Sequence, residues 1–202
     1  MFSGSRSTSI GGGFFTAVTG DFHAHFPGTS ERNEIQSPGR IAPSVGFYQI
    51  PLSRTINLDE PVKTDGIVMF RSSILNLDPT TASTWIDLLG SGGDIILHIS
   101  FRLLENVIVF NSRPAHGEWL NESRVNLTGS FIGQNYTVTV FDHGDRYQVL
   151  TNGRTKSYYY KQLKGDVTAV SYNTNVGQTS IFSDTIAAQT YNSFAALVPG
   201  SA

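Results

Sequence analysis

Cysteine is absent from the 202 residues of the chain. Its absence excludes disulfide bonds, thiolate zinc sites, iron–sulfur clusters and cysteine nucleophiles. It leaves the redox compartment open, because a protein without cysteine tolerates both oxidising and reducing surroundings. A chain of this length can bury roughly 70% of the surface that it exposes when unfolded, so its core is large enough to be stable without a disulfide bond or a bound metal.

An excess of cationic charge is lacking too. Lys and Arg number 14 against 16 Asp and Glu, which gives a net charge of -2. No surplus of cations is therefore available to displace the counterions of a nucleic-acid backbone. We expect no nucleic acid among the partners of this protein.

Long apolar runs are also missing. The longest, residues 66–70 and 106–110, fall far short of the roughly 20 apolar residues that a membrane-spanning helix requires. We therefore predict no membrane insertion. The apolar stretch at residues 14–18 follows three glycines and is too short for a secretory leader, so we expect no cleaved signal peptide.

The composition changes near residue 45. Residues 1–45 are rich in Gly, Ser, Thr and Pro and poor in aliphatic side chains, a composition that cannot offset chain entropy by burial. This pattern predicts a flexible N-terminal extension over residues 1–45. Residues 46–202 then form a single folded domain.

Short apolar or alternating runs, separated by Gly, Pro, Asp and Asn, fill residues 46–202. This pattern is typical of an antiparallel all-β domain and predicts a β-sandwich of two antiparallel sheets. The turns 142–145 and 151–154 place glycine where a tight hairpin needs a positive φ. The predicted strands are residues 47–50, 54–58, 66–73, 84–89, 94–102, 106–112, 117–125, 136–142, 146–151, 156–163, 167–172 and 184–191.

Polar and aromatic side chains gather on three consecutive predicted strands between residues 94 and 125. Strand alternation points Leu97, Ile99 and Phe101 to one face of the first strand and its polar residues to the other. The next two segments add an amide, an indole, a carboxylate and a guanidinium to the same neighbourhood. The gathered side chains are His98, Ser100, Arg102, Asn111, Trp119, Glu122 and Arg124.

This set has the chemistry that a sugar requires. A sugar hydroxyl both donates and accepts hydrogen bonds, so it suits planar groups with fixed geometry such as Arg, Asn, Glu and His. The indole of Trp119 offers a flat surface to the apolar face of a hexose. The competing explanation is an ordinary solvated sheet face with cross-strand ion pairs, in which the tryptophan belongs to the core.

The ordered segments 98–102, 106–113 and 119–124 resemble the sugar-site pattern of the galectins, most closely those of mushroom fruiting bodies. The resemblance continues through residues 139–149 and 180–183 and covers roughly residues 50–192. It implies a galectin-like jelly-roll sandwich that binds β-galactosides of the lactose and N-acetyllactosamine type, without catalysis, cofactor or metal. Fungal relatives that lose the stacking tryptophan shift toward chitooligosaccharides, whereas Trp119 is present here.

The resemblance also implies a role for each residue. His98 and Arg102 would bond the axial 4-hydroxyl of galactose, and Asn111 and Glu122 its 6-hydroxyl. Trp119 would stack under the ring. Arg102, Glu122 and Arg124 would reach the neighbouring sugar, with Glu122 fixing both guanidinium groups.

Ser100 departs from the asparagine that animal galectins commonly carry at its place in the motif. Because serine is shorter, we expect it to change fine specificity, such as tolerance for extended or fucosylated sugars. Binding of chitooligosaccharides or of sugars containing N-acetylgalactosamine therefore stays open as an alternative.

The resemblance further implies partners and location. The partners would be β-galactoside glycans on glycoproteins or glycolipids, cross-linked by a homodimer or homotetramer that agglutinates cells. The protein would be made in the cytoplasm and could reach the extracellular space by export without a leader.

Three other classes compete with a lectin. A glycoside hydrolase needs two carboxyl groups across the scissile bond, and the pattern places just Glu122 in the cluster. Glu118 has a parity opposite to that of the neighbours of Glu122, and Glu105 lies in a turn. A metal site at His23 and His25 lacks a third ligand. In a purely adhesive sandwich, the run of tyrosines at 158–160 would be a protein-binding surface instead of a sheet edge.

Overall fold

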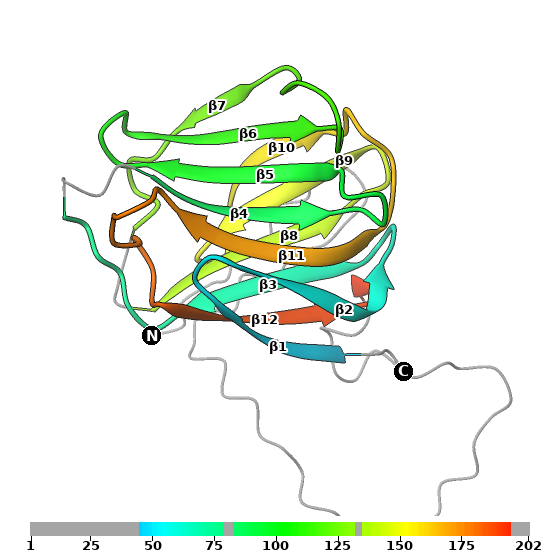
Figure 1. Cartoon of the computed structure of the whole chain (residues 1–202), viewed down its shortest axis with the longest axis horizontal. Helices are drawn as coiled ribbons and strands as arrows, with labels where there is room; N and C mark the ends of the chain where they lie inside the picture. The colour runs from blue at the N-terminus through cyan, green and yellow to red at the C-terminus, as the bar shows by residue number, and fades with distance from the viewer. Residues whose placement is uncertain (1–44, 79–82, 132–134, 195–202) are drawn as a thin grey trace, which may run out of the picture. The chain divides into compact units, whose positions relative to one another are not determined.

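The computed structural model describes residues 45–78, 83–131 and 135–194. These residues contain no α-helix, and thus no helix long and apolar enough to cross a membrane. The predicted all-β fold is confirmed (Figure 1). The strands are β1 (Val45–Pro51), β2 (Arg54–Val62), β3 (Ile67–Ser72), β4 (Ser83–Leu89), β5 (Ile95–Arg102), β6 (Val107–Arg113), β7 (Ser123–Asn126), β8 (Tyr136–Asp142), β9 (Arg146–Thr151), β10 (Arg154–Tyr160), β11 (Val167–Thr174) and β12 (Thr185–Tyr191).

The strands form two six-stranded antiparallel sheets that lie face to face (Figure 1). One sheet has the order β1-β12-β3-β8-β9-β10, and the other has the order β2-β11-β4-β5-β6-β7. The three strands that the sequence analysis singled out, β5, β6 and β7, are direct neighbours at one end of the second sheet. Their outward side chains therefore share one surface.

The core lies between the sheets and explains the alternation along β5. Leu97, Ile99 and Phe101 are fully buried, whereas His98 and Arg102 are half-buried on the other face, as the alternation predicts. The ring of Phe101 packs edge-on against Phe182 with 5.2 Å between the ring centroids. This apolar packing fixes the face of β5 that turns outward.

Both predicted glycine hairpins are present. The 142–145 turn joins β8 to β9 with Gly144 at a φ of 90°. The 151–154 turn joins β9 to β10 with Asn152 and Gly153 at φ values of 47° and 73°. Two successive positive φ angles match a type I′ turn, whose twist suits the flanking strands.

The prediction of a strand over residues 117–125 is wrong in its first part, since β7 begins at Ser123. The residues before β7 make hydrogen bonds other than those that pair strands. The amide of Gly117, for example, donates to the carbonyl of Pro114 in a turn. The amide and carbonyl of Asn121 both bond to the side chain of Gln162, at 2.9 and 2.6 Å. Trp119 therefore lies on a loop, where strand parity does not apply.

The tyrosine run on β10 alternates as the sequence indicates. Tyr159 is buried, and Tyr158 and Tyr160 are exposed on the other face of the strand.

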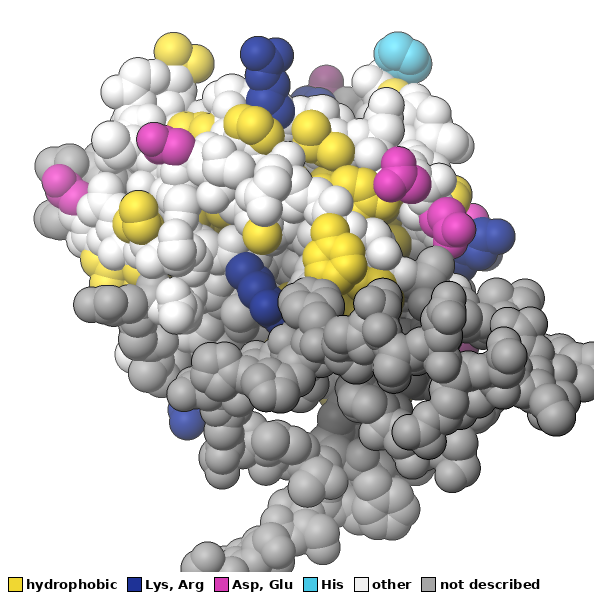
Figure 2. All heavy atoms as spheres, turned by 90° about the horizontal axis from the view of Figure 1, so that it is seen from below, with side chains coloured by type: hydrophobic (Ala, Val, Ile, Leu, Met, Phe, Trp, Pro, Cys, Tyr) yellow, Lys and Arg dark blue, Asp and Glu magenta, His cyan; other side chains and the backbone are white. Residues whose placement is uncertain are grey.

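Figure 2 shows the molecule from below the view of Figure 1, which is the side on which β1 lies. On this side, hydrophobic side chains lie among polar and charged ones.

Two predictions fall on the N-terminal part of the chain. The extension over residues 1–45 lies outside the described residues, apart from Val45, which begins β1. His23 and His25 lie outside them as well. Among the described residues, no group of three His, Asp or Glu side chains is placed to hold a metal ion.

Candidate functional site

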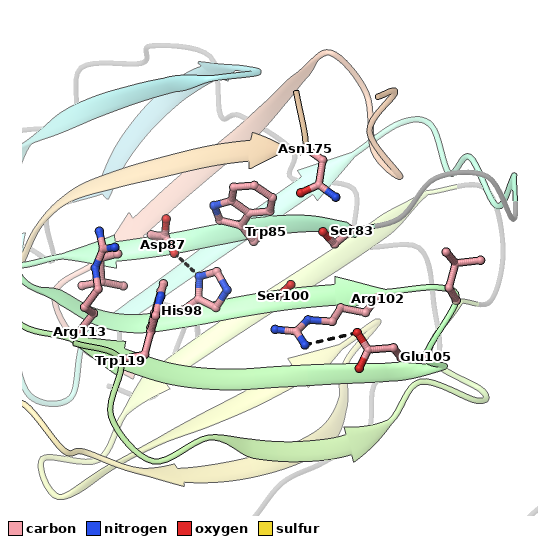
Figure 3. A pocket seen from close by; sticks show the side chains of 12 residues that line it. Ser83, Trp85, Asp87, His98, Ser100, Arg102, Glu105, Arg113, Trp119 and Asn175 are labelled. Carbon is pink, nitrogen blue, oxygen red and sulfur yellow. Dashed lines mark hydrogen bonds and ion pairs between the residues drawn. The ribbon is translucent and has the colours of Figure 1, made fainter. Parts of the chain in front are cut away.

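A groove of about 640 Å³ lies on the outward face of β4, β5 and β6, which is the face turned away from the core (Figure 3). It is open to solvent and combines two indoles with polar and charged groups. The groove is lined by Ser83, Trp85, Asp87, Ile95, His98, Ser100, Arg102, Leu104, Glu105, Arg113, Trp119 and Asn175.

The register between β4 and β5 places the groove residues in rows. Asp87 lies opposite His98, Trp85 opposite Ser100, and Ser83 opposite Arg102. Residues two apart on a strand share a face, so each strand contributes every second side chain to the groove.

His98 is held in place by a buried carboxylate. Its Nδ1 atom lies 2.6 Å from Oδ1 of Asp87, a residue that is only 5% exposed. The other carboxylate oxygen accepts a hydrogen bond from the Ser171 hydroxyl at 3.1 Å, and the side-chain amide of Asn173 donates to that hydroxyl. With Nδ1 bound to a carboxylate, Nε2 is the ring nitrogen available to a ligand.

Two arginines and two glutamates form a closed ring of charges, the Arg–Glu ring. Arg102 lies 3.3 Å from Oε1 of Glu105 and 3.7 Å from Oε2 of Glu122. Arg124 pairs with Oε2 of Glu105 at 2.8 Å and, through Nε, with Oε1 of Glu122. The bond to Glu122 is the main reason that the pKa of Arg124 is raised above its usual value.

The Arg–Glu ring orients its guanidinium groups. Exposed ion pairs contribute little to stability, because water screens them and long side chains lose entropy when they are fixed. A guanidinium held by two carboxylates, however, presents its remaining N–H groups in a fixed direction. We therefore infer that the Arg–Glu ring holds the guanidinium of Arg102 in a fixed orientation toward the groove before a ligand binds.

Trp119 forms one wall of the groove. Its side chain is 43% exposed, a large fraction for an indole. The ring centroid lies 4.8 Å from that of His98, and the guanidinium carbon of Arg113 lies 5.0 Å from it. Arg113 thus supports the indole by a cation–π contact while much of the ring stays open to solvent.

The structure places the seven side chains that the sequence analysis selected in three kinds of position. His98, Ser100, Arg102 and Trp119 line the groove. Glu122 and Arg124 lie beside it in the Arg–Glu ring. Asn111 is opposite His98 in the register but is buried, and its side-chain oxygen accepts a hydrogen bond from the amide of Ser112.

The inference that just Glu122 lies in the cluster is wrong. Glu105 belongs to it as well. The turn after β5 is tight, because the amide of Asn106 donates to the carbonyl of Leu103. This turn brings the carboxylate of Glu105 next to the guanidinium of Arg102, which lies three residues earlier in the chain. Asp87 is a third carboxylate at the groove. Each of the three is already bonded to an arginine or a histidine.

The sequence analysis missed the contribution of β4 and of distant loops. Trp85 and Asp87 lie in a segment predicted as a strand, and their equal parity indicates a shared face. Only the pairing of β4 with β5 shows that this face belongs to the groove. Asn175 follows β11 and carries no local signal for the site.

Comparison with known sequences shows where the chain belongs. The sequence pattern of the family described as galactoside-binding lectins matches residues 48–182. The chain is 44% identical to the anti-tumor lectin of Cyclocybe aegerita over 157 residues, which are 75% of this chain and 99% of that protein. It is 39% identical to galectin-1 of Coprinopsis cinerea over 140 residues, which are 69% of this chain and 90% of that protein.

Comparison with solved structures shows a galectin-like fold. The crystal structure of the Caenorhabditis elegans galectin LEC-6 superposes with a TM-score of 0.54 at 17% identity, covering 72% of this chain and 93% of that one. This likeness confirms the predicted galectin-like sandwich. The matched family and relatives are lectins, which confirms the prediction of a galactoside-binding lectin instead of an enzyme. The chain belongs to the galectin family of galactoside-binding lectins and is similar to its fungal members.

Proposed function

We propose that the groove binds β-galactosides of the lactose and N-acetyllactosamine type. The observation that carries this proposal is the exposed indole of Trp119 beside the imidazole of His98, 4.8 Å between centroids, with Arg102 in the same groove. The indole offers an apolar surface for the C–H face of a sugar ring. The imidazole and guanidinium offer directed polar atoms for its hydroxyls.

The resemblance to the galectins gives each residue a role, and the contacts of His98 and Arg124 fit the roles given to these two. His98, with Nδ1 bound to Asp87, directs Nε2 to the 4-hydroxyl of galactose, and Arg102 donates to the same oxygen. Glu122, together with Asn111, serves the 6-hydroxyl. Arg124 reaches the neighbouring sugar from the Arg–Glu ring.

Discrimination between galactose and glucose follows from these roles. Glucose carries an equatorial 4-hydroxyl, which would leave the polar atoms of His98 and Arg102 without their partner. Each buried polar group left unpaired costs about 1–3 kcal/mol. Chitooligosaccharides, which lack the axial hydroxyl, are disfavoured for the same reason.

We further propose that the protein acts as a homodimer or homotetramer that cross-links glycoproteins or glycolipids. A shallow polar groove exchanges water bonds for protein bonds of similar strength, so a single site binds weakly. Several linked sites raise the apparent affinity by factors of about 10² to 10⁴ when they engage one surface.

Both proposals predict that the protein aggregates beads coated with lactose. Because aggregation requires at least two sites in one assembly, we expect turbidity to rise with protein and to fall when free lactose is added. Beads coated with glucose serve as the matched control and are expected to stay dispersed.

Light scattering and the amount of bead-bound protein separate the two proposals. Protein that coats lactose beads without aggregating them would contradict the multivalent assembly. If no protein binds to the lactose beads, or if equal amounts bind to lactose and glucose beads, the proposed galactoside site is contradicted.

A further inference from the structure

The loop that carries Trp119 is fixed by hydrogen bonds to the two residues that follow the indole. The amide of Leu120 donates to the carbonyl of Ser112 at 2.9 Å. The backbone of Asn121 bonds to the side chain of Gln162 in both directions: its amide donates to Oε1 at 2.9 Å, and its carbonyl accepts from Nε2 at 2.6 Å. The Gln162 side chain thus makes the pair of bonds that a residue of a neighbouring antiparallel strand would make.

Gln162 is itself held by its neighbours in the chain. The ammonium of Lys161 lies 2.7 Å from Oδ2 of Asp142, and these side chains are 8% and 4% exposed. The amide of Lys161 also donates to the carbonyl of Asp145 at 3.0 Å. On the other side, Leu163 packs against the core. Because both neighbours are fixed, the backbone of Gln162 is a firm support for the bonds of its side chain.

The side-chain amide of Gln162 has a defined partner for each of its N–H groups. Nε2 also donates to the hydroxyl of Tyr159, which lies 2.9 Å from Oγ of Ser112. The hydroxyl of Ser112 donates its one proton to the carbonyl of Ile96 at 2.8 Å. Tyr159 therefore donates to Ser112 and accepts from Gln162. One N–H group of Gln162 is thus bound to Tyr159 and the other to Asn121.

These bonds join the sheet that carries the groove to the opposite sheet. Ser112 lies on β6, whereas Tyr159 lies on β10 and Gln162 follows that strand. Ser112 and Tyr159 are buried, at 0% and 3% exposure. Hydrogen bonds between buried groups are costly to break, because each group left without a partner has also lost its water. The position of the Trp119 loop is therefore set in part by the opposite sheet.

We propose that Gln162 is a positioning residue for the galactoside site, which holds Trp119 where the indole can stack on the sugar. This inference rests on the proposed function. Gln162 is not part of the groove lining, and it binds the chain at Asn121, two residues after the indole. It acts on the sugar through the loop and not by contact. Without its bonds, the indole occupies the binding position for only part of the time, and the apparent affinity falls by that fraction.

Gln162→Met tests the proposal, because methionine has a similar length and no amide. We expect calorimetry to show about fivefold to tenfold weaker binding of lactose, as when the binding position is populated for about a fifth to a tenth of the time. Gln162→Glu is expected to lose a similar factor, since a carboxylate keeps the acceptor and lacks both N–H donors. Gln49→Met replaces an exposed glutamine on β1, in the opposite sheet, and is expected to bind lactose like the wild type.

A spectroscopic readout separates positioning from a general loss of stability. Protein labelled with fluorinated tryptophan gives one fluorine resonance for each of its two tryptophans, and Trp119→Phe assigns them. In Gln162→Met without sugar, we expect the Trp119 resonance to shift or broaden and the Trp85 resonance to stay in place. Val149→Ala removes buried methyl groups from the core, so it is expected to lower the midpoint of thermal unfolding. It is expected to leave both the Trp119 resonance and the lactose affinity unchanged.

The outcomes separate the proposed function from the role of Gln162. Wild-type protein that does not bind lactose would overturn the proposed function. If the wild type binds lactose and both Gln162 variants bind it equally well, the role of Gln162 is overturned. The same conclusion follows if Gln162→Met loses affinity with an unchanged Trp119 resonance, or if Val149→Ala loses as much affinity as Gln162→Met.

Discussion

Trp119→Ala is expected to weaken lactose binding by about 100-fold or more, which corresponds to roughly 2.7 kcal/mol of binding free energy. The indole supplies the one flat apolar surface assigned to the galactose ring, and alanine leaves the C–H face of the sugar in contact with water. The side chain is 43% exposed and lies on a loop outside the core. Its removal is therefore expected to leave the fold intact.

Calorimetry with lactose and thermal unfolding of the same sample check this prediction together. Trp119→Phe is the matched variant, because it keeps a smaller aromatic face and is expected to lose less affinity than alanine. A Trp119→Ala protein that binds lactose like the wild type would place the stacking surface elsewhere in the groove.

Arg102→Lys is expected to weaken lactose binding by about 30-fold or more, although the charge is kept. An ammonium cannot reproduce the planar fork that pairs with Glu105 and Glu122 while donating toward the groove. The change is therefore expected to weaken the proposed sugar contact and to break the Arg–Glu ring on one side.

Titration with lactose measures the loss, and Arg154→Lys is the control. Arg154 is an exposed arginine on β10, in the other sheet, so its replacement is expected to leave the affinity at the wild-type value. Equal affinities of Arg102→Lys and Arg154→Lys would show that charge alone, and not fork geometry, is used at position 102.

The fold was predictable wherever the signal is local. Alternation along β5 separates buried Leu97 and Phe101 from outward His98, because each strand residue reports its own face. The turn at Asn152 and Gly153 is likewise decided by two residues that tolerate a positive φ. The error at residues 117–122 has a nonlocal cause, since the side chain of Gln162 binds that segment from 41 residues away.

Some residues of the candidate site could likewise be predicted from local sequence, and others could not. His98, Ser100 and Arg102 follow from parity on one strand, and Trp119 from its place in the family pattern. Asp87 and Trp85 required the register of β4 against β5, which no local pattern gives. Sequence spacing could place Glu105 in a turn but could not show that the turn returns its carboxylate to two arginines.

The central claim is that the groove recognises the axial 4-hydroxyl of galactose, and one matched pair of disaccharides tests it directly. Lactose and cellobiose have the same linkage and differ only in the configuration of that hydroxyl on the non-reducing sugar. Because glucose leaves the polar atoms of His98 and Arg102 unpaired, we expect calorimetry to show saturable binding of lactose and about 50-fold weaker binding of cellobiose, or none. Equal affinities for the two sugars, or no heat with lactose at millimolar concentration, would contradict the account.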